Sequence, residues 1–373
     1  MSAWNLVRLR GAVSAGSIPL YDFIEYWSAG RLFLAGRNPY SSVELLAVQQ
    51  SLGWKRADPL IMWNPPWTLV LLLPFARLPY WIGRAAFTFL EVALIVAAAE
   101  WLWRQAGGSE RRRWIAWLTG VLFVPCMEAL YLGQSSPLVL AGLVGFLWAL
   151  ERKCDFIAGL FILAIAAKPH VPYLFWIFLL FWIWQDARWR VLAGAGVALS
   201  SALGLVLAVN PSAISGYLET LESGPGPLLW KPPSLGVALM LLVSPGLTSL
   251  RFVPTLLGIL CAFGLCWHWR SVFSWRRYLD PILLLSVLSS SFTWMYDWVV
   301  LLPLVILLLV WTEADPGRNW WVPAVLFAMQ LLIIFMECII KDHNDFYNLW
   351  VPPALWLLYW LAQPRQAQPR CLA

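Results

Sequence analysis

Residues 85–103 read AAFTFLEVALIVAAAEWLW, and residues 281–309 read PILLLSVLSSSFTWMYDWVVLLPLVILLL. A helix that crosses the hydrocarbon core of a bilayer needs about 20 consecutive, mostly apolar residues. Stretches of this kind recur from residue 64 to the end of the chain. The sequence therefore predicts an all-α, polytopic helical membrane protein.

The composition excludes several other classes of protein. Of the 373 residues, 61% are hydrophobic and 12% are charged, whereas an average soluble domain is about 25% charged. The mean hydropathy is +0.69. A soluble globule and a disordered chain are therefore excluded. The six cysteines contain no CxxC pair and no spacing typical of metal ligands, so we expect neither a disulfide scaffold nor a structural metal site.

We expect one transmembrane domain over residues 1–373. Its first outer segment, residues 1–79, contains a re-entrant helix, and the transmembrane helices occupy residues 80–362. About 11 spans are expected, several of them short and interrupted by proline, which requires surroundings of protein or water. They are predicted near residues 80–103, 114–131, 134–150, 156–168, 170–184, 191–209, 252–269, 281–293, 297–312, 320–340 and 347–362.

The basic residues predict the orientation in the membrane. Most of the 26 Lys and Arg residues form short clusters between apolar spans, at 104–113, 152–153, 188–190, 270–277 and 365–370, and the positive-inside rule places them in the cytoplasm. The net charge of +6 is therefore no sign of nucleic-acid binding. Successive loops must alternate between the two sides of the membrane. With the basic clusters in the cytoplasm, this holds only if the proline-interrupted stretches 63–75 and 235–247 do not cross, so both are predicted to be re-entrant or interfacial.

On this assignment, ionisable and polar residues gather in the outer loops. Lys168, between Ala167 and Pro169, needs a counter-charge, because an ionised group at membrane depth is costly. Carboxylates and cations on one face of the membrane suggest a site for an anionic, lipid-linked substrate. The outer group comprises Asp22, Glu25, Arg31, Arg37, Gln134, Lys168, His170, Lys231, Tyr296, Asp297, Lys341, Asp342, His343 and Asp345.

Several segments of these loops resemble a known family. Residues 21–31 read YDFIEYWSAGR and residues 35–40 read AGRNPY, which is similar to the first outer loop of glycosyltransferase family 87. Further similar segments follow in the family's order, over about residues 20–312: Asn64-Pro65-Pro66 with Pro74, Gly133-Gln134-Ser135-Ser136, Ala167-Lys168-Pro169, Pro233-Ser234-Leu235, and SFTWMYD at residues 291–297.

The resemblance implies a GT-C fold and a membrane-bound glycosyltransferase that uses a polyprenyl-phosphate sugar. The expected reaction transfers a mannose- or arabinofuranose-like sugar to a glycolipid or polysaccharide on the extracytoplasmic face of the cell membrane. The implied partners are the lipid-linked donor, the glycan acceptor and the bilayer, with no nucleic acid. No cofactor is indicated, and a divalent metal requirement is left open.

The chain departs from the family pattern in two places. Members usually have a transmembrane helix before the first motif, but only 21 residues precede Asp22. Either the true start lies upstream or this first span is lacking. Many relatives also have a histidine near the Trp294 motif, where this chain has Tyr296 and Asp297.

The first outer loop contains the candidate catalytic base. Glycosyl transfer from a lipid phosphate needs a base for the acceptor hydroxyl and cations for the departing phosphate. Asp22 is the candidate base of an inverting transfer, and the alternative is that it caps the helix that begins at Phe23. Glu25, one turn later, either orients a sugar or forms a structural ion pair with Arg31.

The remaining candidates are substrate-binding residues, each with a structural alternative. Lys168 is expected to bind the lipid phosphate or, alternatively, to reach toward the headgroups. His170 either binds the same phosphate or is a plain hydrogen-bonding residue. Gln134 either bonds a sugar hydroxyl or caps a helix. Arg31, Lys231, Tyr296 and Asp297 complete the set, and Asp297 alternatively stabilises a helix dipole.

One candidate metal site and two alternative functions remain beside this interpretation. The run Lys341-Asp342-His343-Asn344-Asp345 looks like a metal cluster, but such loops are usually solvated. A transporter or flippase for lipid-linked sugars would show two related halves, and none is found. A non-catalytic subunit of envelope biosynthesis would not need an outer acid with a facing lysine.

Overall fold

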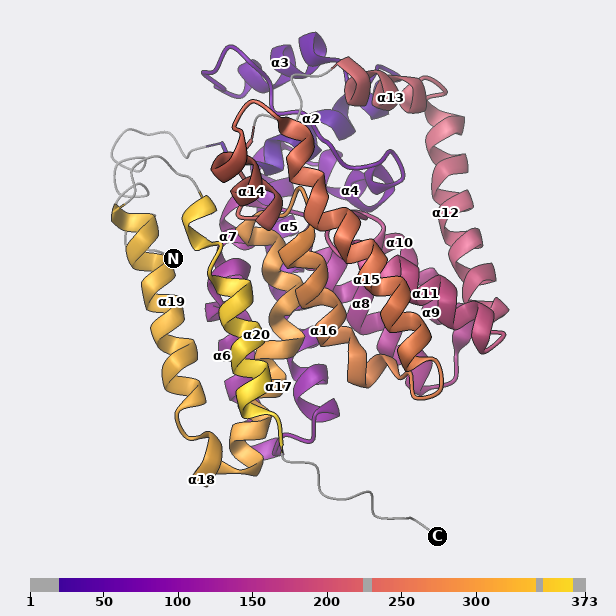
Figure 1. Cartoon of the computed structure of the whole chain (residues 1–373). Helices are drawn as coiled ribbons and strands as arrows, with labels where there is room; N and C mark the ends of the chain where they lie inside the picture. Colours follow the sequence, from indigo (N-terminus) through magenta and orange to yellow (C-terminus); the bar gives the residue numbers. More distant parts are fainter. Residues whose placement is uncertain (1–19, 224–229, 340–344, 365–373) are drawn as a thin grey trace.

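The computed structural model describes residues 20–223, 230–339 and 345–364, and every regular element within these ranges is a helix (Figure 1). The helices run mainly between two opposite ends of the molecule. One end holds the short helices α2 (Phe23–Leu34), α3 (Ser42–Ser51), α4 (Thr68–Ala76), α13 (Ala213–Ser223) and α14 (Leu235–Val243). The all-α prediction is confirmed over these residues.

Five helical segments are long and apolar enough to cross a membrane, and a bent pair makes up to six. They are Tyr80–Gln105 (α5), Trp189–Val209 (α12), Thr248–Trp269 (η3 with α15, Val253–Trp269), Met295–Ala314 (η4, Met295–Leu301, with α17, Leu302–Ala314) and Pro316–Ile339 (α18, Pro316–Asn319, with α19, Val322–Ile339). The expected number of about 11 spans remains a prediction. Shorter helices complete the bundle: α8 (Ser136–Glu151), α9 (Asp155–Leu160), α10 (Ile162–Ile165), α11 (Tyr173–Gln185), α16 (Trp275–Ser289) and α20 (Val351–Ala362).

The bent pair joins Glu110–Leu122 (η1, Glu110–Arg112, with α6, Arg113–Leu122) to α7 (Val124–Leu132) at an angle of 53°. Pro125 explains the break, because a proline inside a helix removes a backbone donor and clashes with the preceding turn. The backbone N–H of Val124 donates instead to Oε1 of Gln330 in α19, at 2.8 Å. The bend therefore leaves this donor satisfied, as a low-dielectric environment requires.

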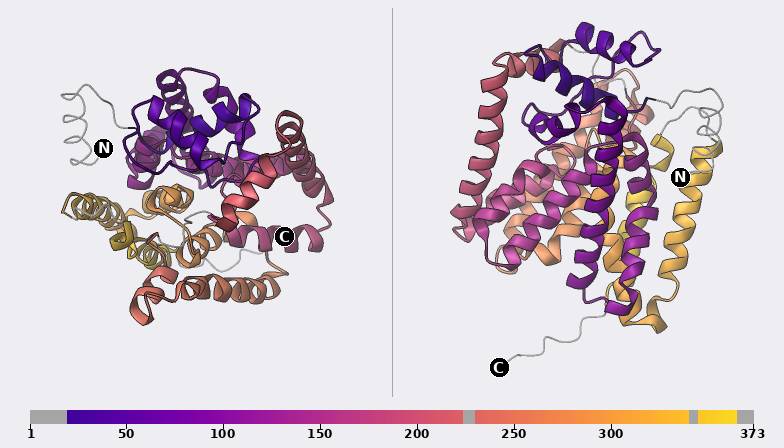
Figure 2. Two further views of the ribbon diagram at one scale, coloured as in Figure 1. Left: turned by 90° about the horizontal axis from the view of Figure 1, so that it is seen from above. Right: turned by 180° about the vertical axis from the view of Figure 1, so that it is seen from behind.

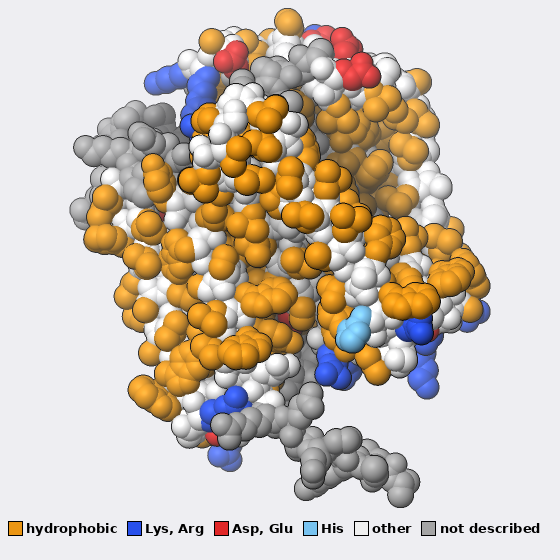
Figure 3. All heavy atoms as spheres, in the orientation of Figure 1, with side chains coloured by type: hydrophobic (Ala, Val, Ile, Leu, Met, Phe, Trp, Pro, Cys, Tyr) orange, Lys and Arg blue, Asp and Glu red, His pale blue; other side chains and the backbone are white. Residues whose placement is uncertain are grey.

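The segment formed by η4 and α17 lies at the centre of the bundle. Within its apolar window 72% of the residues are buried, against 22–33% in the other four long segments. Figure 2 shows α12 along one flank of the molecule and α19 along the other. Many large apolar side chains on the outer helices are exposed, including Phe89 and Trp184. Figure 3 shows hydrophobic side chains over most of the visible face. Such a surface is suited to contact with lipid tails.

The described basic clusters, at residues 104–113, 152–153, 188–190 and 270–277, lie at the end of the molecule opposite α3 and α13, where Figure 3 shows Lys and Arg side chains along the lower edge. The cluster at 365–370 lies outside the described residues. Ion pairs join several helices there: Arg112 to Glu313, Arg188 to Asp155 and Arg276 to Glu151. The two ends therefore differ in charge. At the basic end some of the cationic side chains form ion pairs at the surface, and the other end contains the buried polar groups described below.

The two stretches predicted not to cross form only short helices. Helices α4 and α14 have nine residues each, which corresponds to about 13–14 Å at 1.5 Å per residue, under half of the hydrocarbon thickness. Helix α4 packs beneath α2, where Gly30 lies so close to Ala76 that a Cβ atom would clash with it. The first helices therefore form a cap on one end of the bundle.

Candidate functional site

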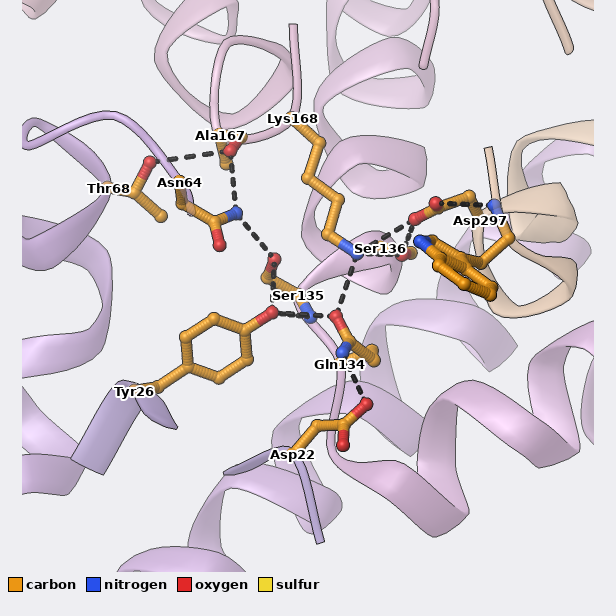
Figure 4. A network of polar contacts seen from close by, with 11 residues as sticks. Asp22, Tyr26, Asn64, Thr68, Gln134, Ser135, Ser136, Ala167, Lys168 and Asp297 are labelled. Carbon is orange, nitrogen blue, oxygen red and sulfur yellow. Dashed lines mark hydrogen bonds and ion pairs between the residues drawn. The ribbon is translucent and has the colours of Figure 1, made fainter. Parts of the chain in front are cut away.

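Four side chains from distant segments form one chain of polar contacts beneath this cap (Figure 4). Asp22 Oδ2 accepts a hydrogen bond from Gln134 Nε2 at 2.7 Å, and Gln134 Oε1 accepts one from Lys168 Nζ at 2.8 Å. Lys168 Nζ also lies 2.8 Å from Asp297 Oδ1. The structure thus brings together Asp22, Gln134, Lys168 and Asp297, four of the predicted site residues.

The turn between α7 and α8 places Gln134. Gly133 has a φ of 75°, a left-handed conformation that glycine adopts at no steric cost. The backbone N–H groups of Gly133 and Gln134 both donate to the carbonyl of Ala129. From α5, Arg84 Nη2 donates to the carbonyl oxygens of Leu130 at 2.6 Å and Tyr131 at 3.0 Å. These contacts fix the backbone from which the Gln134 side chain projects.

Lys168 lies between α10 and α11 and is only 5% exposed. Its ammonium group donates to Gln134 Oε1, to Ser136 Oγ at 3.0 Å and to Asp297 Oδ1. The expected counter-charge is therefore confirmed, and it is Asp297. The interpretation as a lysine reaching toward the headgroups is wrong, because the side chain is buried. An ammonium group has three protons, so all three are directed at protein groups.

Asp297 is completely buried in the first turn of η4. Its Oδ2 atom accepts from the backbone N–H of Trp294 at 3.1 Å, while Oδ1 accepts from Lys168 and from the hydroxyl of Ser136 at 2.7 Å. The structural alternative for Asp297 is therefore seen, because the carboxylate stabilises the start of a helix, and it also balances the charge of Lys168. Its expected role in substrate binding remains a prediction. The ring of Tyr296 completes the surroundings, with its centroid 4.5 Å from Lys168 Nζ.

The contacts of Lys168 settle how the Gln134 amide is oriented. An ammonium group can only donate, so the amide oxygen faces Lys168 and the amide nitrogen faces Asp22. Tyr26 supports this orientation, because its hydroxyl donates to the same oxygen at 2.7 Å. Gln134 is therefore no helix cap: Ser135 precedes α8, and the Gln134 side chain lies between two charged residues. A neutral amide thus links the lysine to Asp22.

Asp22 precedes α2, but its side chain makes no capping hydrogen bond, so the capping interpretation is wrong. Its carboxylate is partly exposed, and among the described residues only Gln134 donates to it. Burial raises the pKa of Asp22 above its ordinary value, while the Gln134 hydrogen bond and the charges of Lys168 and Arg56 oppose the rise. Asp22 is therefore a carboxylate with increased basicity and one oxygen available to a ligand.

Glu25 does not form the ion pair that was the structural alternative for it. Arg31 lies instead over the ring of Trp27, 5.4 Å from its centroid, and within the described ranges no ion pair involves Glu25. Six residues correspond to about 240° around a helix, so Glu25 and Arg31 lie on different faces of α2. Burial, together with the carboxylate of Asp22, raises the pKa of Glu25 well above its ordinary value.

His170 and Lys231 lie outside the chain of contacts. The imidazole of His170 is exposed, and its backbone carbonyl accepts from Ser290 Oγ at 3.1 Å. Lys231 is exposed beside Trp230. Neither contacts Asp22, Gln134, Lys168 or Asp297, so both remain candidate ligands of a substrate and have no part in the buried network.

Sequence reasoning quoted four supporting residues of the network only as parts of family-like segments and gave them no role: Tyr26, Asn64, Ser135 and Ser136. Asn64 Nδ2 donates to the carbonyl of Ala167 at 2.9 Å and to Ser135 Oγ at 3.3 Å, which in turn lies 3.3 Å from the Tyr26 hydroxyl. The serines at 135 and 136, at the start of an apolar helix, and the asparagine before Pro65 were the signals that could have identified them. Arg56 was not among the predicted site residues, although the positive charge of its exposed guanidinium lowers the pKa of Asp22.

The structure identifies no metal centre in the parts of the chain that it describes: no group of three His, Cys, Asp or Glu side chains there is suited to hold a metal ion. Of the run expected to resemble a metal cluster, Lys341, Asp342, His343 and Asn344 lie outside the described residues. Asp345 is described and lies in η5 (Asp345–Asn348).

Comparison with known proteins identifies the family. Searches of curated proteins and of solved structures found no match. The family model of glycosyltransferase family 87 matches residues 63–296, a range that contains Gln134, Lys168 and Tyr296. This range is more than half of the 373 residues, so the chain belongs to glycosyltransferase family 87 and is a membrane glycosyltransferase.

Proposed function

We propose that the protein transfers a sugar from a polyprenyl-phosphate donor to a hydroxyl of a glycolipid or polysaccharide, with inversion, and that Asp22 is the general base. The observation that carries this proposal is the state of the Asp22 carboxylate. Oδ2 is held by an amide at 2.7 Å, while Oδ1 has no partner among the described residues. The carboxylate is thus oriented but not neutralised.

The identity of the partner matters for the chemistry. A lysine or arginine bound directly to Asp22 would favour the ionised form and weaken the base. Here the charge of Lys168 is balanced by Asp297, and only the neutral amide of Gln134 reaches Asp22. Burial raises the pKa of Asp22, which brings its basicity closer to what proton transfer needs.

The proposed step is a single displacement. The acceptor oxygen forms a bond to the anomeric carbon while its proton passes to Asp22 Oδ1. The bond from the anomeric carbon to the phosphate oxygen breaks, and the phosphate leaves with that electron pair. Attack from the face opposite the phosphate inverts the anomeric centre, and no covalent sugar–enzyme intermediate forms.

The leaving phosphate needs positive charge, and Lys168 has no proton left for it. We therefore assign Lys168 to holding Gln134 in place. The exposed guanidinium of Arg56, which acts on Asp22 and lies over the ring of Trp54, is the better candidate for the phosphate, with Lys231 as a second. From the positive-inside rule we expect this end of the molecule on the extracytoplasmic side of the cell membrane.

The test is single-turnover transfer by the purified chain in liposomes, with polyprenyl-phosphate mannose and polyprenyl-phosphate arabinofuranose offered separately. Asp22→Asn should lower the transfer rate by about 10²–10⁴-fold, because a positioned base contributes that much, and should leave the donor KM largely unchanged. Glu25→Gln is the matched control, one turn along the same helix, and should stay within about tenfold of wild type.

The pH profile provides a second readout. Asp22 must be ionised to accept the proton, so kcat/KM should rise with pH through the raised pKa of Asp22. Asp22→Asn should lack this rise. Transfer by Asp22→Asn within about threefold of wild type, with Glu25→Gln inactive, would assign the base to Glu25. Transfer from neither donor by the wild type would exclude both sugars.

A further inference from the structure

Four aromatic side chains lie in succession beside the polar network: Trp63, Trp230, Trp294 and Tyr296. We call them the aromatic platform. The ring centroids of Trp63 and Trp230 are 6.1 Å apart, those of Trp230 and Trp294 are 5.8 Å apart, and those of Trp294 and Tyr296 are 6.4 Å apart. The succession joins three segments that are far apart in the sequence.

Buried polar contacts hold the platform in position. The side chain of Arg251 is buried, and its Nη2 atom donates to the backbone carbonyl of Trp230 at 3.1 Å and to that of Ser291 at 3.4 Å. The backbone N–H of Trp294 donates to Asp297. One buried arginine therefore joins the segment of Trp230 to the segment that precedes Trp294, and the platform is preorganised.

The platform begins at the proposed reaction centre. The ring of Tyr296 lies against Lys168. Lys168 in turn contacts Gln134 and Asp297 (Figure 4). At the other end, Trp63 precedes Asn64, whose side chain is bonded to Ser135. The four residues of the platform are all at least partly exposed, and Trp230 is 40% exposed. A ligand of the platform would therefore lie next to the groups that orient Asp22.

The chemistry of the rings favours a saccharide over an isoprenoid chain. The indole N–H groups of Trp63 and Trp230 have no acceptor among the residues that the structure describes. A sugar ring presents C–H groups to an aromatic face and hydroxyl oxygens to an indole N–H, so it matches both features. An isoprenoid chain matches only the apolar faces and would leave the two donors without an acceptor.

We propose that the aromatic platform binds a saccharide ring of the substrate, with Trp230 as its main stacking residue. The inference rests on the proposed glycosyl transfer, since it places the ring beside the base. The ring belongs either to the acceptor glycan or to the sugar of the donor, and these share the same recognition chemistry. Kinetics distinguishes the two sources.

The binding test uses the full chain in lipid nanodiscs and two soluble probes, methyl α-mannoside and methyl α-arabinofuranoside, observed by saturation-transfer difference NMR. Trp230→Ala should weaken binding of at least one glycoside by about three- to tenfold, the contribution expected of one aromatic contact. Trp230→Phe retains a ring and should recover most of the binding. Trp320→Ala is the matched control, because Trp320 is 71% exposed and lies in the turn after α18, outside the platform.

Three results would overturn the proposal. The first is glycoside binding by Trp230→Ala equal to that of wild type, and the second is no glycoside binding by wild type itself. The third is that Trp230→Ala weakens binding of farnesyl phosphate, a soluble isoprenoid probe, while glycoside binding is unchanged. In transfer assays, a rise in only the acceptor KM assigns the ring to the acceptor, and a rise in only the donor KM assigns it to the donor.

The experiment separates failure of the platform from failure of the proposed function. Asp22→Asn should keep glycoside binding while it loses transfer, since Asp22 is no part of the platform. If Asp22→Asn is inactive and Trp230→Ala is normal in binding and transfer, the platform is wrong and the base assignment stands. If Asp22→Asn transfers normally and Trp230→Ala loses glycoside binding, the base assignment is wrong and the platform stands.

Discussion

Asp297→Asn keeps the size of the side chain but removes the negative charge that faces Lys168. In the native protein, Nζ and Oδ1 are 2.8 Å apart, and the two side chains are 6% and 1% exposed. Removal of one member of a buried pair leaves the other charge without compensation and typically costs about 3–5 kcal/mol. Ser136 and Gln134 still accept hydrogen bonds from Lys168, so we expect a loss of about 3 kcal/mol in the free energy of unfolding.

Lys168→Met should cost a similar amount, because Asp297 then keeps only the hydroxyl of Ser136 and the N–H of Trp294. The double variant buries neither charge, so its cost should fall below the sum of the single costs by about 2 kcal/mol or more. The matched control is Arg37→Met. Arg37 and Glu44 are 2.9 Å apart but 55% and 28% exposed, so this pair should contribute no more than about 1 kcal/mol.

The assay is chemical unfolding of the four proteins of this cycle, and of Arg37→Met, in detergent micelles. The reasoning is refuted if Asp297→Asn costs no more than Arg37→Met, or if the single costs add in the double variant. It is refuted equally if Lys168→Met unfolds like wild type and only its donor KM rises. That last result would return Lys168 to the role of phosphate ligand.

Two further predictions concern residues near the site. Burial, together with the Glu337 carboxylate, raises the pKa of Asp345 to about 7. The folded state therefore disfavours the ionised form of Asp345, so the free energy of unfolding should fall as pH rises from about 4 through about 7. In unfolding titrations, the free energy of unfolding of Asp345→Asn should depend less on pH than that of wild type. Gly133→Ala should destabilise by about 1–2 kcal/mol or more and lower kcat, because φ is 75° and the added Cβ would lie 2.8 Å from Arg84 Cζ and from Phe23 Cβ. Gly196→Ala, whose Cβ meets nothing within 4 Å in α12, is the control, and unfolding titrations in which both variants match wild type would contradict the argument.

The sequence by itself determined the class of the protein, and it named four residues that the structure joins in one network: Asp22, Gln134, Lys168 and Asp297. Apolar stretches such as residues 85–103 are sufficient to predict helices in a membrane, because burial of the backbone in lipid leaves few alternatives. The outlying charge of Lys168 was sufficient to predict a counter-charge, since an isolated ammonium at that depth is costly. The proline-interrupted stretches 63–75 and 235–247 were predicted not to cross, and the helices that the structure forms there, α4 and α14, have only nine residues each.

Only the tertiary structure decided which polar side chains of the site contact one another. Lys168 and Asp297 are 129 residues apart, and Asp22 and Gln134 are 112 residues apart, so no periodicity in the sequence relates them. For the same reason an ion pair with Arg31, a neighbour along the chain, was one of the two expectations for Glu25, although the helix turns these side chains apart. The aromatic platform likewise needs three segments that only the packing of α14, η4 and the α2–α4 cap brings together. Helical periodicity reports which face of a segment is apolar, whereas the partner of a buried polar group depends on how the helices pack.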